Sequence, residues 1–124
     1  MLDLTNFDQN DVGNPNNNIF GLPSNEDNAD LIILNVPWEV TVSYGAGTAR
    51  APEAIMKASL QVDLYDPDMP DAWKRGYYLT PTDRKVLLKS DYLRKEAELY
   101  IDFISKDEDI ATNQFMQKTI KEIN

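Results

Sequence analysis

A short apolar run at residues 30–36, DLIILNV, is the feature that most limits the folds open to this chain. Pro37 ends the run, and no regular alternation with polar residues interrupts it. A strand covered by helices on both faces has a sequence of this kind. A buried helix is the alternative, but seven residues are too few for one, and Ile32-Ile33 favours extended structure. The run therefore predicts a buried strand of a parallel sheet.

A helix start is predicted after a long loop at residues 38–51. Pro52 stands where a first helical residue needs no N–H, and the charge of Glu53 suits a helix N-terminus. Residues at helical spacing then follow: Ile55, Ala58, Ser59 and Val62. Residues 61–66 alternate in polarity, so a second short strand remains open there. Residues 66–71, DPDMPD, have the composition of a turn.

Two amphipathic helices are predicted in the C-terminal half. Between residues 83 and 106 an apolar stripe is formed by Val86, Leu93, Ala97, Tyr100 and Ile104. The outer side of this helix is expected to carry Arg94, Lys95, Glu96 and Glu98. A charged break at residues 106–109 precedes a final helix, marked by Ala111, Phe115, Met116, Ile120 and Ile123.

One clear strand and two amphipathic helices are too few elements for a complete α/β domain. A single strand has no partner for its hydrogen bonds, and such helices need a sheet to cover. We therefore expect α/β architecture, with residues 29–124 forming the opening part of a larger domain. Residues 1–28 are rich in Asn and Asp and poor in apolar side chains, so they are expected to form a flexible arm.

Composition excludes several classes of site. The chain has no cysteine and no histidine, which removes disulfides, thiolate zinc sites, a cysteine nucleophile and the commonest general base. Its formal net charge of −9 argues against a nucleic acid or an anionic membrane as the main partner. Neither a membrane span nor a signal peptide is recognisable, so we expect a cytoplasmic location.

Two local patterns resemble known binding motifs without matching them. In the segment 45–50, GAGTAR, Arg50 replaces the third glycine of a dinucleotide-binding loop, and the segment begins well beyond the predicted strand. The carboxylates of Asp66, Asp68 and Asp71 alternate, but prolines interrupt them. A solvated acidic loop is therefore favoured over a calcium site.

Residues 36–47 form a different kind of segment. They follow the carboxyl end of the predicted strand, where open α/β sheets place their ligand sites. The segment is rich in small residues and contains one carboxylate and several hydroxyl groups. A plain surface loop is the alternative interpretation.

A family resemblance is carried by Leu34-Asn35-Val36-Pro37-Trp38-Glu39, Thr41, Ser43-Tyr44, Gly47, Arg50, Pro52 and Ala54-Ile55. In this order the residues resemble the opening segment of the ureohydrolases, the family of arginase, agmatinase and formimidoylglutamase. The resemblance covers about residues 29–66, and residues 66–74 resemble an agmatinase-like subgroup. The chain departs from the family pattern at Glu39, Arg50 and Ala51, which bears on the branch more than on membership.

The resemblance implies a three-layer αβα, arginase-like fold with a central parallel sheet. It also implies two Mn²⁺ ions whose bridging hydroxide attacks a guanidino or formimino carbon, releasing urea or a related amide. The family takes its metal ligands from Gly-Gly-Asp-His-Ser, Asp-Ala-His-x-Asp and Asp-x-Asp segments, none of which occurs here. We therefore expect the N-terminal part of an agmatinase-like enzyme, without catalytic or metal-binding residues of its own and inactive by itself.

For the complete enzyme, the resemblance implies a small guanidino substrate and a homotrimer or homohexamer. Within this chain, Glu39, Ser43 and Tyr44 are the residues expected at the rim of the substrate pocket. The alternative is a non-catalytic interaction module that kept only the first strand–helix unit of the family.

Overall fold

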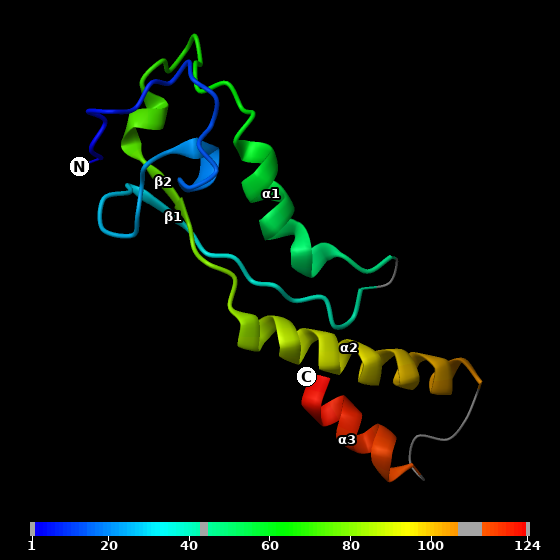
Figure 1. Ribbon diagram of the computed structural model, residues 1–124. Coiled ribbons are helices and arrows are strands. Elements are labelled where there is room, and N and C mark those ends of the chain that lie inside the picture. Colours follow the sequence, from blue (N-terminus) through cyan, green and yellow to red (C-terminus); the bar gives the residue numbers. More distant parts are fainter. Residues whose placement is uncertain (1, 43–44, 107–112, 124) are drawn as a thin grey trace. The chain divides into compact units, whose positions relative to one another are not determined.

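The computed structural model describes residues 2–42, 45–106 and 113–123 (Figure 1). Its regular elements, in chain order, are η1 (Ile19–Gly21), β1 (Leu31–Ile33), η2 (Thr48–Arg50), α1 (Ala51–Ser59), η3 (Ala72–Arg75), β2 (Tyr77–Leu79), α2 (Arg84–Ser105) and α3 (Gln114–Ile123). The η elements are short 3-10 helices. Helices together with a small parallel sheet fit the α/β class predicted from the sequence.

The chain divides into two compact units, each made of two segments. The first unit comprises Met1–Asn35 and Arg50–Thr82, and the second comprises Val36–Ala49 and Asp83–Asn124. The long loop after β1 thus belongs to the same unit as α2 and α3.

The sheet of the first unit consists of β1 and β2, which pair in parallel with Ile32 opposite Tyr78. The helix α1 lies in the connection between them, as parallel strands require a long crossover. The predicted strand is confirmed, although it covers only Leu31–Ile33. Its predicted burial is wrong, because Leu31 and Ile32 are 47% and 49% exposed. The sheet has two strands among the described residues, and no helix layer there buries both faces of β1.

The strand β2 was not predicted, whereas the possible strand at residues 61–66 is irregular. Two backbone hydrogen bonds to Ala58 and Ser59 turn the chain at the end of α1, and the Asp63 carboxylate then accepts the N–H of Tyr65. These local bonds compete with strand pairing. The alternation at residues 61–66 therefore reflects a turn.

The N-terminal segment contributes buried residues to the first unit. The Asn18 side chain accepts the Leu79 N–H at 2.7 Å, and Ile19 is buried. Ser59 of α1 accepts the N–H of Phe20 at 2.9 Å. These contacts cross the boundary at residue 29 that the sequence suggested, and the flexibility of residues 1–28 stays a prediction.

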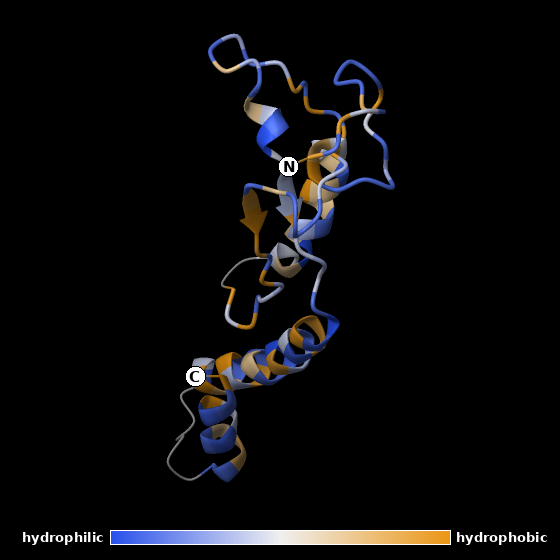
Figure 2. Ribbon diagram, turned by 90° about the vertical axis from the view of Figure 1, so that its left-hand side faces the viewer, coloured by the Kyte–Doolittle hydropathy of each residue, from blue (hydrophilic) through white to orange (hydrophobic). Residues whose placement is uncertain are grey.

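The second unit is built on α2, whose predicted extent is confirmed. Asp83 caps its N-terminus, because the carboxylate accepts the N–H groups of Lys85 and Val86. Apolar and polar residues are mixed around this helix, as Figure 2 shows. The final helix is confirmed over Gln114–Ile123. Of the predicted break at 106–109, residues 107–109 lie outside the described residues, as does Ala111.

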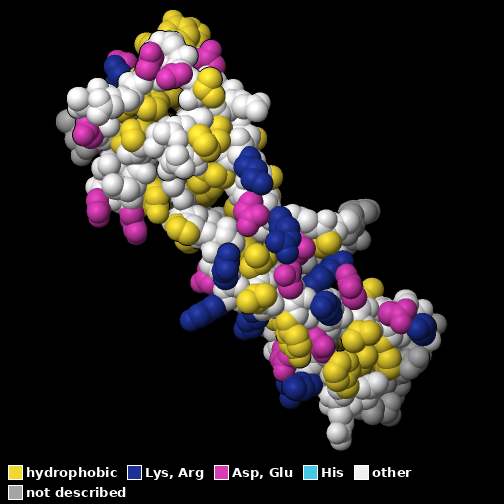
Figure 3. All heavy atoms as spheres, viewed as in Figure 1, with side chains coloured by type: hydrophobic (Ala, Val, Ile, Leu, Met, Phe, Trp, Pro, Cys, Tyr) yellow, Lys and Arg dark blue, Asp and Glu magenta, His cyan; other side chains and the backbone are white. Residues whose placement is uncertain are grey.

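A small apolar core joins the elements of the second unit. Val40 from the loop packs against Leu93 and Ala97 of α2, and Ile123 of α3 packs at the edge. Numerous apolar side chains elsewhere remain at the surface, as Figure 3 illustrates on one face. Among the helices that the structure describes, none has the length and apolar character needed to cross a membrane.

Candidate functional site

The loop after β1, residues 36–49, carries the residues that the sequence placed at a substrate-pocket rim. Ser43 and Tyr44 lie outside the described residues, so Glu39 is the one of the three that can be placed. Apart from the short η2 turn, the described part of this loop has no helix or strand. Its backbone groups therefore depend on turns and side chains for hydrogen bonds.

The Glu39 carboxylate is directed at the backbone of its own loop. Its Oε2 atom accepts the N–H of Gly47 at 2.7 Å and the N–H of Ala49 at 3.1 Å. The side chain is buried, with 9% of the residue exposed. The Glu39 N–H in turn donates to the Ser90 hydroxyl on α2 at 2.9 Å. Glu39 thus connects two parts of the loop and anchors it to α2.

Arg94 of α2 holds the same loop through carbonyl groups. Its Nη1 atom donates to the carbonyl oxygens of Val42 at 2.7 Å and Val40 at 3.4 Å. Its Nε atom donates to the Glu98 carboxylate, one turn along the helix, at 2.8 Å. The prediction that Arg94 lies on the outer side of the helix is wrong, because its side chain is only 16% exposed.

The environment of Glu39 favours its ionised form. Hydrogen bonds from the Ala49 and Gly47 amides hold the pKa of the Glu39 carboxyl below its ordinary value. Burial acts in the opposite direction, and the positive charge of Arg94 lowers the pKa further. Glu39 is therefore a carboxylate at neutral pH, with its charge balanced by amide dipoles and a guanidinium group.

Ser90 and Arg94 were not recognised from the sequence as partners of this loop. They are four residues apart, so they occupy one face of α2, and Ser90 is completely buried. The sequence does show that Ser90 is a polar residue on the interior side of the helix, which is an unusual position. It does not show which residues Ser90 and Arg94 contact, because these partners lie more than fifty positions earlier in the chain.

The residues in this structure do not fit a two-metal centre. The chain contains no histidine, and no group of three or more Asp, Glu, His or Cys residues is placed to hold a metal ion in the described ranges. At the acidic turn, Asp66 accepts the N–H groups of Asp68 and Met69, and Asp71 pairs with Lys74 at 2.6 Å. These carboxylates organise a turn and an exposed ion pair, in agreement with a solvated loop.

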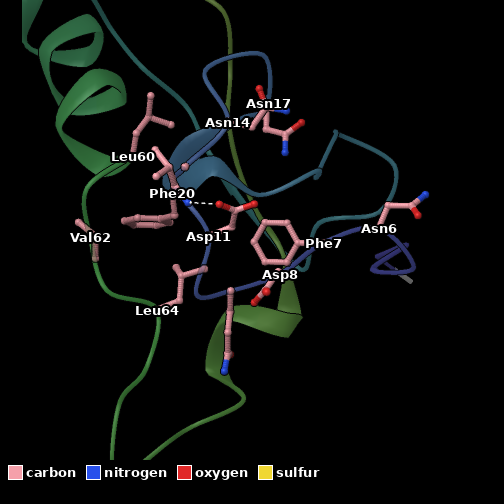
Figure 4. Close-up of a pocket in the computed structure, with 13 residues that line it drawn as sticks. Asn6, Phe7, Asp8, Asp11, Asn14, Asn17, Phe20, Leu60, Val62 and Leu64 are labelled. Atoms are coloured by element: carbon pink, nitrogen blue, oxygen red, sulfur yellow. Dashed lines mark hydrogen bonds between the residues drawn. The ribbon is translucent and has the colours of Figure 1, made fainter.

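A pocket of about 140 Å³ in the first unit was not predicted. It is lined by the N-terminal segment and the residues after α1, with Phe7, Phe20 and Leu64 among its walls (Figure 4). The carboxylate of Asp11 accepts the adjacent Val12 N–H, and that of Asp8 accepts groups of Asn10. These local bonds stabilise turns, and they do not define a ligand chemistry.

A second pocket, of about 350 Å³, lies at the carboxyl ends of β1 and β2. Asn35 and Thr80 follow the two strands, and the Asn35 side-chain amide donates to the Thr80 carbonyl. A carbonyl oxygen can only accept a hydrogen bond, so the atom of Asn35 that faces Thr80 is Nδ2. The other polar atom of the Asn35 side chain, Oδ1, takes no part in this bond. Among the described residues Oδ1 has no partner, but it is also inaccessible, so a molecule in the pocket would not reach it.

Comparison with known proteins gave one partial sequence match. A 41-residue segment is 37% identical to an N(1)-aminopropylagmatine ureohydrolase from Synechocystis sp.. The match covers 33% of this chain and only 13% of that protein. No family model matches the chain, and no solved structure does. The chain is thus similar to a hydrolase over about a third of its length.

Proposed function

We propose that this chain is the N-terminal part of an agmatinase-like ureohydrolase. In its longer form the protein hydrolyses a guanidino or formimino group of a small molecule and releases urea or a related amide. The observation that carries this proposal is the 37% identity over 41 residues to a ureohydrolase. The order of strand β1, long loop and helix α1 with Pro52 in its first turn supports it, since the sequence resemblance lies on these elements.

The metal ions of the proposed reaction belong to residues outside this sequence. Two Mn²⁺ ions would supply an activated hydroxide in such an enzyme. This chain has no histidine, and its described carboxylates form no group that fits the ions. The chain by itself is therefore proposed to be inactive, and its contribution is a strand, a loop and the helices that support them.

The exposed sheet supports a longer protein with an arginase-like αβα architecture. Leu31 and Ile32 of β1 are about half exposed, and Leu34 just after the strand is 75% exposed. Isolated two-stranded sheets are marginally stable, and exposed apolar strands invite further pairing. Additional parallel strands and a helix layer would bury these side chains. Assembly of the complete protein as a homotrimer or homohexamer in the cytoplasm remains part of the proposal.

The experiment that tests this function is an assay of the product of the complete reading frame. Urea release from agmatine, arginine and aminopropylagmatine is measured with Mn²⁺ and after removal of metal by EDTA, and formamide release is measured from formimidoylglutamate. The proposal predicts metal-dependent hydrolysis of at least one substrate, and none by residues 1–124 alone. Lack of hydrolysis by the complete product would contradict it.

A non-catalytic interaction module is the second candidate, favoured by the edge of β1 opposite β2, which pairs with no other strand among the described residues. A partner could add a strand to such an edge. This module would be a folded 124-residue protein whose reading frame ends at Asn124, and which binds a full-length ureohydrolase. A pull-down that recovers no ureohydrolase would exclude it.

A further inference from the structure

In the loop of residues 36–49, a negatively charged side chain binds backbone N–H groups, and a positively charged side chain binds backbone carbonyl groups. The carboxylate of Glu39 accepts two N–H groups near the end of the loop, and the guanidinium of Arg94 donates to two carbonyls near its start. A carboxylate only accepts and a guanidinium only donates, so neither residue can perform the role of the other. Bonds of this charged kind are stronger than neutral ones.

We infer that Glu39 and Arg94 are positioning residues, which fix the backbone conformation of the described parts of the loop, residues 36–42 and 45–49, instead of contacting the substrate. This inference rests on the proposed function, because there the loop that follows the carboxyl end of β1 borders the substrate pocket. It changes the role expected for Glu39 from pocket rim to loop support. It also adds Arg94, which lies 55 positions further along the chain.

The anchor on α2 makes this support rigid. Ser90 is completely buried and accepts the Glu39 N–H, and it lies one helical turn before Arg94. Val40, between the two anchoring regions, packs against Leu93 on the same helix. The loop is thus attached to α2 by an apolar contact and by polar contacts on either side of it. A regular helix is a more precise support for a loop than another loop would be.

The charges explain why the support requires these residue types. Amide dipoles and Arg94 stabilise the ionised form of Glu39 and lower its pKa. The Glu98 carboxylate on the solvent side orients the Arg94 guanidinium toward the loop. A displacement of about 1 Å in residues that hold a substrate can reduce a reaction rate by roughly a hundredfold. Weakening this support would therefore alter substrate binding without removing any group that reacts.

Amide hydrogen exchange tests the inference in the product of the complete reading frame. Glu39→Ala is expected to raise the exchange rates of the Gly47 and Ala49 amides by roughly tenfold, because their acceptor is lost. Glu39→Gln keeps a side-chain oxygen and should restore part of the protection. The matched control is Glu53→Ala, which removes an exposed carboxylate of α1 and should change neither amide. Equal exchange in wild type and Glu39→Ala would overturn the inference.

Arg94 is tested against its exposed neighbour. Arg94→Met removes both donors to the loop and should raise amide exchange across residues 39–42 and 45–49 several-fold. Lys95→Met makes a similar change in charge and volume at an exposed position of α2 and should leave loop exchange unchanged. The inference is contradicted if the two variants behave alike.

Kinetics separate positioning from a purely structural role. For a substrate that the wild type hydrolyses, Glu39→Ala should raise KM several-fold with a smaller change in kcat, and Glu39→Gln should recover part of the loss. Unchanged kcat and KM in a variant with unprotected amides would overturn the positioning role. If the wild type hydrolyses no guanidino compound, the proposed function fails, whereas the exchange measurements still decide whether these side chains hold the loop.

Discussion

At the scale of single residues, Glu39 illustrates how one carboxylate can organise an irregular segment. Its carboxylate accepts hydrogen bonds from two amides of the same loop, and its backbone N–H donates to the buried Ser90 hydroxyl. Ala49 is buried, and an unpaired buried N–H is costly. The conformation of this loop therefore depends in part on the Glu39 carboxylate, together with Ser90 and Arg94 of α2.

Acidification should weaken the second unit through Glu39. The pKa of this carboxyl is lowered in the folded protein, so its stabilising effect is complete above the pKa of the unfolded chain, about 4.3. It is lost as pH falls through the lower, folded value. Chemical unfolding of wild type and Glu39→Gln between pH 3 and 7 should show a difference in stability near neutrality that diminishes below about pH 4. A difference that grows on acidification would contradict this assignment.

Gly76 occupies a backbone conformation with positive φ, which favours glycine. Its φ of 75° is unfavourable for other residues, and an added Cβ would lie 3.2 Å from the Cα of Ala29. We expect Gly76→Ala to destabilise the first unit by about 1–3 kcal/mol. Gly45→Ala is the matched control, because nothing lies within 4 Å of its Cβ position. Equal unfolding midpoints for the two variants in urea would be inconsistent with the structure.

At the scale of elements, predictions succeeded where local signals were strong. The span of α2 agreed with the apolar spacing, and Pro52 marked the start of α1 correctly. The strand β2 was missed because three residues show no periodicity and their pairing with β1 is a long-range contact. The same limitation hid Ser90 and Arg94, whose partners are distant in sequence. Local patterns thus indicated elements, but not the contacts between them.

The cap of α2 provides a prediction at this scale. Asp83→Ala removes the acceptor of the Lys85 and Val86 amides and should destabilise the second unit by about 0.5–2 kcal/mol. Asp68→Ala, at an exposed turn position of the first unit, serves as the control. Circular dichroism during urea unfolding gives both values. A cap variant as stable as the control would exclude this role of Asp83.

The helix α2 carries one leucine in the core of the second unit and another at the surface. Leu93 is 2% exposed and contacts Val40, so Leu93→Ala should cost about 2–5 kcal/mol. Leu88 lies on the same helix but is 68% exposed, and Leu88→Ala should be nearly neutral in the 124-residue chain. The comparison uses the same substitution in one helix. A reversed order of the two effects would contradict the packing described here.

At the scale of the whole molecule, many large apolar side chains of the described residues are exposed. The residues concerned include Leu31, Ile32, Leu34, Val36, Leu88 and Leu99. Large exposed apolar surfaces usually mark contacts with other protein segments. In the complete enzyme proposed above, further strands and helices would cover them. The arginase-like architecture and the metal site stay proposals, because the described residues form a two-stranded sheet and no group that could hold a metal ion.

Exposed apolar surface should be detectable in the isolated chain. We expect residues 1–124 to bind a hydrophobic dye such as ANS and to unfold over a broad range of denaturant concentration, because its sheet lacks cover. The complete product should bind little dye and unfold cooperatively. A cooperative two-state transition of residues 1–124 without dye binding would favour the interaction module.

The nucleotide sequence directly after codon 124 tests the central claim most directly. If the chain is the N-terminal part of a ureohydrolase, the frame continues soon into a Gly-Gly-Asp-His segment, which supplies the first histidine and carboxylate ligands. A stop codon at that position, in an independently sequenced genomic copy, would contradict the claim, because the 124 residues contain no histidine with which to build the metal site.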